Sequence, residues 1–277
     1  MRVSAVYLTY NPDVDLLNKS FISALENCDN IYVYDNNSTV SPRCSHESIM
    51  IVEGKDNIGV SGLNYVISLA FSEGSDFIII LDQDSVLPSG FVHDALKRYE
   101  SNPGVYCPVV YDRVRSKRTY VEDPSSRYIK LSTTIGSGLI ISKDIFIKVG
   151  IFDESFFLDC VDIDYCFRLN NHDINLYSDA KSIMIHSIGD SFICFFNLKI
   201  SVHSPSRHYL YYRNSLRLVT RNYVPLGWKI KQIAKISCQW LLYSLLSKRK
   251  KEDFTAFILA LMHFSGRRSK PVDFFNK

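Results

Sequence analysis

The chain has 277 residues, 46% of them hydrophobic and 22% charged, which suits one large domain or two small ones and excludes a disordered chain. Seven cysteines without a CxxC pair argue against a disulfide framework or a zinc site and favour a reducing compartment. The sequence has no run of about 18 apolar residues, and its apolar start breaks at Asn11-Pro12, so we expect neither a spanning helix nor a signal peptide.

The net charge of +3 conceals an asymmetry along the chain. Residues 205–277 carry 15 Lys and Arg against 3 Asp and Glu, a balance of +12, whereas residues 1–204 carry 17 against 26, a balance of −9. An acidic body with a basic tail indicates two surfaces with different partners. We therefore expect a domain over 1–204 and a separate C-terminal region over 205–277.

Short β-rich runs alternate with helical patterns over the first 110 residues. We expect strands at 3–10, 30–35, 49–53 and 77–84, and helices at 14–27 and 60–72. The run at 77–84 is apolar until it meets two carboxylates, which is typical of a strand buried on both faces. This alternation predicts βαβ units and an α/β fold with a mainly parallel sheet flanked by helices.

The rest of the chain is less regular. We expect a loop or hairpin at 111–130, a strand at 136–142, a helix at 161–173, and two late strands at 174–179 and 182–187.

From residue 205 the pattern becomes helical and basic, with helices at 229–246 and 254–264 and the cluster Lys248-Arg249-Lys250-Lys251 between them. Such a basic amphipathic pair is typical of an interfacial membrane anchor. An ordinary helical subdomain packed on the sheet fits the same pattern.

Polar residues follow each of the first four predicted strands. They occur at Thr9 to Asn11, at Asp35, at Asn57 to Gly59, and at Asp82 and Asp84. Ligands of open α/β sheets bind at the carboxyl ends of strands, where these loops would converge. The chain has no P-loop, GxGxxG or GxSxG motif, so a bound nucleotide would be held by Asp and Asn side chains and a metal.

Asp82 and Asp84 are the sharpest local signal. Carboxylate oxygens suit Mg²⁺ or Mn²⁺, which typically bind one or two carboxylates together with substrate phosphates. A polar turn after the strand is the plainer alternative.

Together these motifs resemble the family-2 inverting glycosyltransferases of GT-A fold. The resemblance continues in order through GSG (136–138), FDESFF (152–157) and DCVDIDYCFRL (159–169), and covers roughly residues 1–220. The Asp-Gln-Asp form and the HSIGD segment (186–190) look like the bacterial rhamnosyltransferase subgroup.

The resemblance implies roles for individual residues. The nucleotide side would be lined by Thr9, Asn11, Asp35, Asn57, Gly59 and Asp82. Asp84 would bind the divalent cation, Mg²⁺ or Mn²⁺, with His186 completing the metal site, although an isolated histidine is often structural.

Other positions would face the sugar and acceptor: Gly136, Ser137, Gly138, Arg207 and Arg213. The glycines fit equally a tight turn that only glycine tolerates. The arginines lie in SRHYLYYRNS, which resembles an RxYYxxRN stretch of rhamnosyltransferases; they suit phosphate recognition or a solvated helix face.

Inverting transfer requires a carboxylate that deprotonates the acceptor hydroxyl. Alignment with relatives on Cys166 and Arg168 places this base at Asp162. Val161 replaces the glutamate that many relatives carry, which leaves Asp159 as an alternative base. Both could instead be acids favoured by a helix N-terminus.

The resemblance implies transfer of L-rhamnose from dTDP-L-rhamnose to a lipid-linked oligosaccharide in O-antigen or capsule assembly. We expect a cytoplasmic enzyme, peripheral at the inner face of the membrane, with an anionic membrane surface as partner and no nucleic acid. Alternatives are a hexosyltransferase with a UDP-sugar donor, a nucleotidyltransferase and a non-catalytic binding module. The absence of QxxRW argues against a processive synthase.

Overall fold

The structure is a computed structural model that describes residues 1–112, 117–118, 126–186, 191–195 and 198–266. The chain divides into two compact units. The sheet unit comprises Met1–Phe152 and Arg168–Ile188, and the helical unit comprises Asp153–Phe167 and Gly189–Lys277. The helix α5 (Val161–Asn171) begins in the helical unit and ends in the sheet unit.

A nine-stranded sheet forms the centre of the sheet unit, in the order β3-β2-β1-β4-β8-β5-β9-β7, with β6 paired to β5. Six strands run parallel: β1 (Val3–Thr9), β2 (Asn30–Asp35), β3 (Ile49–Glu53), β4 (Phe77–Leu81), β5 (Val105–Asp112) and β9 (Leu176–His186). The antiparallel members are β6 (Lys117–Arg118), β7 (Tyr128–Leu131) and β8 (Ile140–Ser142). This architecture confirms the predicted α/β fold with a mainly parallel sheet.

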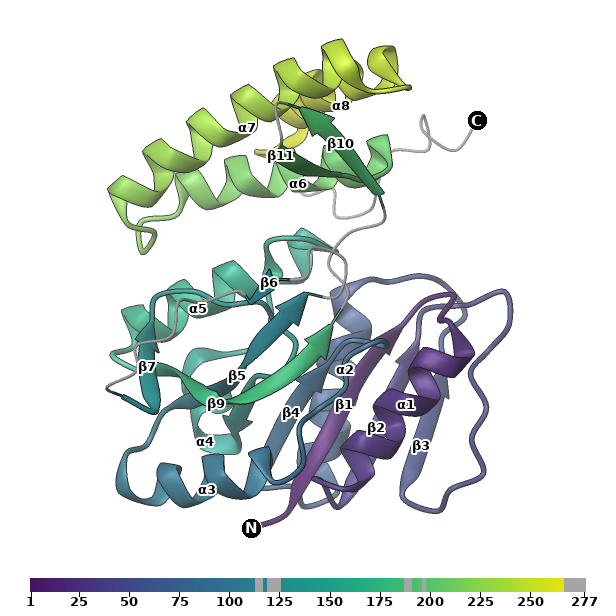
Figure 1. The fold of residues 1–277 in the computed structure, drawn as a ribbon, viewed down its shortest axis with the longest axis vertical. Coiled ribbons are helices and arrows are strands. Elements are labelled where there is room, and N and C mark those ends of the chain that lie inside the picture. The colour runs from purple at the N-terminus through teal and green to yellow at the C-terminus, as the bar shows by residue number, and fades with distance from the viewer. Residues whose placement is uncertain (113–116, 119–125, 187–190, 196–197, 267–277) are drawn as a thin grey trace. The chain divides into compact units, whose positions relative to one another are not determined.

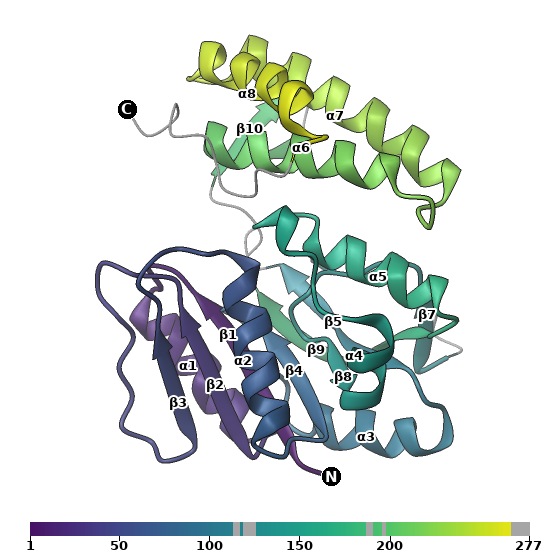
Figure 2. The ribbon, with the colours of Figure 1, turned by 180° about the vertical axis from the view of Figure 1, so that it is seen from behind.

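Helices cover both faces of this sheet. The helices α1 (Val14–Leu25) and α3 (Phe91–Ser101) lie on the face seen in Figure 1. They share an apolar core with alternate sheet residues such as Ala5, Val33 and Ile79. The helices α2 (Val60–Ser72) and α4 (Lys143–Val149) lie on the other face, shown in Figure 2, where the rings of Phe71 and Phe146 are 5.5 Å apart.

The two late strands predicted at 174–179 and 182–187 are wrong, because the structure has one strand, β9. Its pairing with β5 shifts register between Pro108 and Val109, so that Pro108 faces Asp179 and Val109 faces Ile183. A bulge of this kind inserts extra residues into one strand without ending it. Asp179 at the bulge accepts hydrogen bonds from Arg127 (Nε, 3.0 Å) and Ser182 (Oγ, 2.9 Å).

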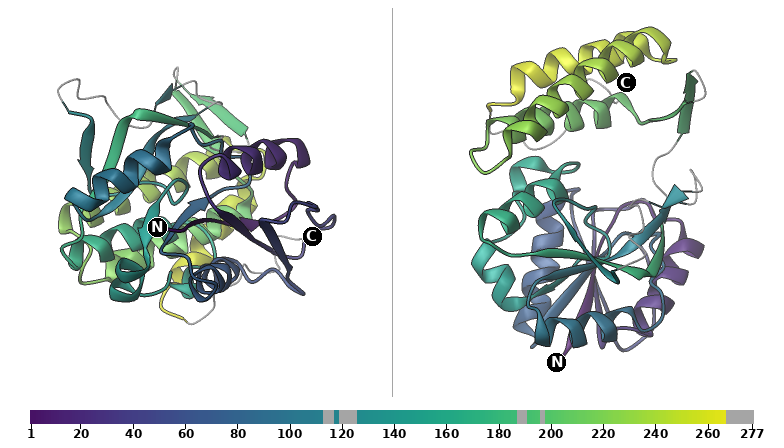
Figure 3. Two further views of the ribbon diagram at one scale, coloured as in Figure 1. Left: turned by 90° about the horizontal axis from the view of Figure 1, so that it is seen from below. Right: turned by 60° about the vertical axis from the view of Figure 1, so that its left-hand side comes forward.

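The helical unit contains α6 (Pro205–Thr220), α7 (Leu226–Leu246), α8 (Lys250–His263) and the hairpin of β10 (Ser191–Phe195) and β11 (Leu198–Val202). Figure 3 shows the three helices side by side, in green to yellow. Ser204 caps α6 by accepting from the amide of Arg207, and Pro205 takes the first turn. Tyr209, Tyr212, Ile236, Tyr243 and Phe257 are among the buried residues that hold the helices together.

The segment that precedes α5 belongs to the helical core as well. A 3-10 turn (Glu154–Phe156) leads to α5, and Phe156 and Phe157 are both buried among residues of the helical unit. The segment with the two candidate bases therefore packs with the C-terminal helices. Within the described residues, none of the helices combines the length and the apolar character needed to cross a membrane.

Candidate active site

The first two strand-end loops meet around Asp35. Thr9 and Asp35 end neighbouring strands in register, and Thr9 Oγ1 donates to Asp35 Oδ1 at 2.9 Å. Ser38 donates to the same carboxylate through its amide (2.8 Å) and its hydroxyl (2.6 Å). Asp35 is only 2% exposed, so its carboxylate is held in a fixed direction at the end of β2.

Asn11 ties the first loop to the second. Its backbone lies in the left-handed region (φ 45°), which asparagine tolerates better than most residues. Its amide donates to Ser38 Oγ at 2.7 Å, and its Oδ1 accepts from the amide of Thr39 at 2.8 Å.

Asn36 joins the third loop to the second. Its Oδ1 accepts from the amide of Ile58 at 3.0 Å, while Asn57 Oδ1 accepts from the amide of Gly59 at 3.1 Å. Gly59 has a positive φ of 62° directly before α2, where glycine carries little steric penalty. The structure thus brings together the predicted nucleotide-side residues of the first three loops.

Asp82, Asp84 and His186 come together at the ends of β4 and β9. The strand β4 ends at Leu81, so both acids lie in the turn that follows. His186 Nδ1 lies 3.0 Å from Asp84 Oδ1, and His186 Nε2 lies 3.5 Å from Asp82 Oδ2. The Asp82 side chain is 53% exposed and that of Asp84 19%, which leaves Asp82 the more open to solvent.

Burial by itself would lower the pKa of His186, but hydrogen bonding and nearby negative charges together raise it by more. The hydrogen bond to Asp84 and the negative charges of Asp82, Asp84 and Asp112 hold the pKa above its ordinary value. Asp112 ends β5 opposite His186, is 2% exposed and was not among the predicted site residues. The signal that marked the other loops, a carboxylate directly after an apolar strand, also marks Asp112.

The turn formed by Gly136, Ser137 and Gly138 contacts the turn that carries Asp82. Ser137 Oγ accepts from the amide of Asp82 at 3.0 Å and lies 2.8 Å from Ser85 Oγ, which in turn lies 3.1 Å from His186 Nδ1. Gly138 has φ 89°, and a Cβ there would lie 2.6 Å from Cδ of Pro108. The backbone of Gly138 therefore requires glycine, while the hydroxyl of Ser137 contacts the backbone amide of Asp82.

A divalent cation fits this cluster by the chemistry of its donors. The carboxylates of Asp82 and Asp84 offer the hard oxygen atoms that suit Mg²⁺ or Mn²⁺, and the imidazole of His186 offers a nitrogen donor of the kind that binds transition metals. No group of three His, Cys, Asp or Glu side chains in the described part of the chain is already arranged to hold an ion alone. Substrate oxygen atoms would have to complete the coordination shell.

The two candidate bases belong to the helical unit, just before and within the first turn of α5. Asp159 Oδ1 accepts from Arg207 Nε at 3.3 Å and from Nη2 at 3.4 Å, and the Arg207 side chain is 39% exposed. Asp162 Oδ1 accepts from the amide of Ile163 at 2.8 Å. Both positions also suit acids at a helix N-terminus.

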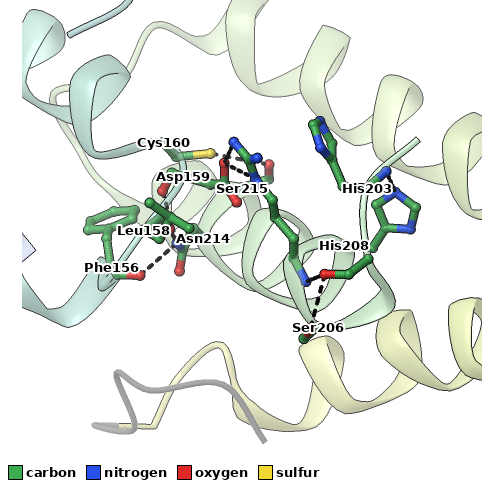
Figure 4. A network of polar contacts seen from close by, with 11 residues as sticks. Phe156, Leu158, Asp159, Cys160, His203, Ser206, His208, Asn214 and Ser215 are labelled. Atoms are coloured by element: carbon green, nitrogen blue, oxygen red, sulfur yellow. Dashed lines mark hydrogen bonds and ion pairs between the residues drawn. The ribbon is translucent and has the colours of Figure 1, made fainter. Parts of the chain in front are cut away.

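Arg213 does not face the surface. It is fully buried, and its Nη2 donates to the carbonyl oxygens of Phe156 (2.9 Å) and Ser155 (3.4 Å). A guanidinium enclosed in this way does not reach a sugar or an acceptor directly, contrary to the expectation from the sequence. Its neighbour Asn214, which the site prediction missed, binds the same segment, as Figure 4 shows.

Known proteins resemble the chain along most of its length. No family model matches it. It is 30% identical over 281 residues to the dTDP-rhamnosyl transferase RfbF of Shigella flexneri, and the match covers 94% of each chain. It is 24% identical over 196 residues to the low-salt glycan biosynthesis hexosyltransferase Agl10 of Haloferax volcanii, covering 63% of each chain.

Solved structures share the fold. S. aureus TarS 1-349 in complex with UDP-GlcNAc superposes with a TM-score of 0.59 at 14% identity, covering 95% of this chain and 80% of TarS. GalNAc-T7 with UDP, GalNAc and Mn²⁺ superposes with a TM-score of 0.58 at 11% identity, covering 95% of this chain and 56% of that one. These similarities show that the chain has the GT-A glycosyltransferase fold.

Proposed function

The chain belongs to the dTDP-rhamnosyl transferase family of GT-A glycosyltransferases, and we propose that it transfers L-rhamnose from dTDP-L-rhamnose to a lipid-linked oligosaccharide in O-antigen or capsule assembly. The observation that carries this proposal is the 30% identity to RfbF over 94% of both chains. The placement of Asp35, Asp82, Asp84 and His186 at the strand ends supports it. A nucleotide sugar needs one site for its pyrimidine ring and another for its diphosphate.

Donor binding falls to the strand-end loops. Asp35, fixed by Thr9 and Ser38, would accept from the pyrimidine ring, and the linked loops at Asn11 and at Asn57 to Gly59 would line the nucleotide. Asp82 would lie near the ribose. These assignments follow the resemblance and the convergence of the loops.

Asp84 and His186 would hold a divalent cation, Mg²⁺ or Mn²⁺, with Asp82 beside them. When bound, the cation neutralises the negative charge that develops on the departing diphosphate. Asp112 at the end of β5 and Ser85 in the turn after β4 would hold the imidazole of His186 in place.

Asp162 is our choice as the general base, with Asp159 as the alternative. In the transfer, the base takes the proton of the acceptor hydroxyl as its oxygen bonds to the anomeric carbon of rhamnose. The bond from this carbon to the diphosphate oxygen breaks at the opposite face, and dTDP leaves with both bonding electrons. The preference for Asp162 rests on the alignment with relatives at Cys166 and Arg168.

An anionic membrane surface is the proposed partner of the C-terminal helices, at the inner face of the cytoplasmic membrane. Exposed apolar residues of α7 recur at helical spacing at Leu226, Ile230, Ile233, Leu241 and Leu245, and Leu246 is exposed as well. On α8 the exposed apolar residues are Phe254, Ile258, Leu261 and Met262. The cluster Lys248 to Lys251, which follows α7 and runs into the first turn of α8, adds the positive charge that anionic lipids attract.

The sequence-based domain boundary at 204/205 remains a proposal. The structure groups Asp153–Phe167 with the C-terminal helices, so the candidate bases share a unit with the proposed membrane surface and the nucleotide loops do not.

A donor screen tests the proposed function. Transfer would be measured with dTDP-rhamnose, UDP-glucose, UDP-galactose and GDP-mannose, each with and without Mn²⁺, on a lipid-linked acceptor extract. We expect turnover with dTDP-rhamnose that EDTA abolishes. Preference for a UDP-hexose would instead favour the second candidate, a hexosyltransferase, which the similarity to Agl10 supports.

A further inference from the structure

The segment before α5 has an unusual backbone. Phe157, Asp159 and Cys160 all have positive φ angles, of 64°, 58° and 63°. Non-glycine residues seldom adopt this region, and a bulky residue such as phenylalanine does so only at a cost in free energy. Such a conformation persists only where its surroundings impose it. The same segment carries Asp159 and leads directly to Asp162.

Asn214 of α6 imposes that conformation. Its Nδ2 donates to the carbonyl oxygens of Phe156 (2.9 Å), Leu158 (2.5 Å) and Asp159 (2.9 Å), and the side chain is fully buried (Figure 4). One amide nitrogen therefore donates to three carbonyl oxygens of a short segment. Carbonyls that point to one spot force the chain to curl around it, which accounts for the positive φ angles.

Arg213 orients this amide. Its Nε and Nη2 donate to Asn214 Oδ1 at 3.0 and 2.9 Å, so the Nδ2 of Asn214 must face the loop. Nη2 also donates to the carbonyl of Phe156 at 2.9 Å. A buried guanidinium is costly unless its hydrogen bonds are made, and here they are made to the loop and to the residue that holds the loop.

We propose that Asn214, oriented by Arg213, is a positioning residue for the transfer reaction. It fixes the path of residues 156–160 and with it the directions in which the carboxylates of Asp159 and Asp162 point. The inference rests on the proposed function, because only a reaction that requires a base makes these directions matter. A base must lie within hydrogen-bonding reach of the proton it removes, and a displacement of about 1 Å can cost about 100-fold in rate.

The substitution Asn214→Asp tests this role in the full-length protein. It keeps an oxygen that accepts from Arg213 but places a second oxygen against the loop carbonyls, so the segment must move away. We expect kcat to fall at least tenfold while the dissociation constant of dTDP-rhamnose stays within twofold. Loss of donor affinity in step with kcat, or unchanged kcat, would overturn the proposal.

A matched control separates positioning from general destabilisation. Asp253 accepts from His208 Nδ1 at 2.7 Å in a buried pair that joins α8 to α6. Asp253→Asn weakens the helical unit at a site remote in sequence from the loop. We expect its kcat to stay within twofold of wild type at a comparable loss of thermal stability. An equal loss of kcat in both variants would reduce Asn214 to a stability residue.

Hydrogen–deuterium exchange gives a readout that needs no activity. The amide of Leu158 donates to the carbonyl of Phe156 at 2.8 Å, inside the clamped segment. Asn214→Asp should speed exchange over 156–160 at least tenfold, and Asp253→Asn should not. Unchanged exchange contradicts the clamp even if no sugar is transferred, whereas faster exchange in a chain that uses another donor contradicts only the proposed function.

A milder variant covers the case in which Asn214→Asp does not fold. Arg213→Lys keeps the positive charge and loses the paired bonds to Asn214, so the amide is held less firmly. The same pattern is expected at smaller size: lower kcat, unchanged donor affinity and faster exchange at 156–160. Wild-type exchange and kcat in a folded Arg213→Lys protein would overturn the orienting role of Arg213.

Discussion

The imidazole of His186 contacts the carboxylate of Asp84 directly, with Nδ1 3.0 Å from Oδ1, although the two residues are 102 positions apart in the chain. The strands β4 and β9 run in the same direction in one sheet, so both residues lie at carboxyl ends of strands. The contact links a histidine at the end of a late strand to the acidic turn, and it makes Asp84 and His186 testable as a pair.

Asp84→Ala should abolish metal-dependent transfer while leaving the fold intact. The substitution removes the carboxylate nearest the imidazole, and we expect kcat/KM to fall at least about 100-fold, because a bound cation contributes several kcal/mol to leaving-group stabilisation. Calorimetric titration of the protein with Mn²⁺, in the presence of dTDP, measures the affinity for the cation.

The control for this prediction is Glu100→Ala, which removes an exposed acid from the last turn of α3. It should keep full activity and full Mn²⁺ affinity. Wild-type turnover in Asp84→Ala, or full wild-type activity in EDTA, would remove Asp84 from the metal role.

Asp162→Asn should lower kcat by about 10²- to 10⁴-fold with little change in donor affinity, because an amide cannot accept the proton of the acceptor hydroxyl. Asp159→Asn should do less, because the alignment on Cys166 and Arg168 places the base at Asp162. Single-turnover rates and dTDP-rhamnose binding, measured on both variants, check the ranking. The reverse ranking would make Asp159 the base and the alignment on Cys166 and Arg168 wrong.

Gly138→Ala should lower the free energy of unfolding by about 2 kcal/mol or more, because it combines a positive φ with a Cβ that meets Pro108 at 2.6 Å. Gly90→Ala is the matched control, since Gly90 also has a positive φ (75°) but has nothing within 4 Å of an added Cβ. Urea unfolding of both variants isolates the cost of the close approach. Equal losses in the two variants would show that backbone conformation alone requires the glycine.

Much of the site was predictable because its residues follow strongly apolar strands. The run before Asp82 is buried along its whole length in β4, and the acids that stop it lie at the carboxyl end of the sheet, as the pattern predicted. Asp112 was not predicted as a site residue because its strand, β5, contains Pro108, and proline weakens a strand pattern. The structure tolerates this proline where the register of β5 against β9 shifts.

In the helical unit, the buried face of α7 was harder to predict from the sequence. In α7, Lys231 and Lys235 are exposed, as expected of a basic amphipathic helix. Gln232 is in fact buried, where its Nε2 donates to Tyr211 Oη (2.9 Å) and Ser215 Oγ (2.7 Å). A buried amide whose nitrogen has two hydrogen-bond partners can lie in a helix core, and a polar residue beside exposed lysines gives no sign of this in the sequence.

Membrane association is best tested with substitutions, because the C-terminal helices also form a buried core. Truncation near residue 228 would remove Tyr243 and Phe257, which are buried against α6, so a shortened chain would lose core as well as surface. Substitutions at exposed positions avoid this. Replacement of the four basic residues at 248–251 by Glu should abolish binding to anionic vesicles, since each Lys or Arg near such a surface contributes about 1 kcal/mol, and the cluster on the order of 4 kcal/mol.

The apolar stripe of α7 is tested separately from the charge. Ile230→Ser with Leu241→Ser, at positions 61% and 53% exposed, should weaken vesicle binding without changing thermal stability. A charge-matched control reverses four exposed lysines of the sheet unit: Lys19, Lys55, Lys97 and Lys130. Flotation with vesicles of anionic and of zwitterionic lipid, at low and high salt, distinguishes the contributions, because salt screens the charge term and leaves the apolar one. If the full-length protein does not float with anionic vesicles at low salt, the exposed stripes of α7 and α8 have another occupant and the membrane surface is not a partner of this chain.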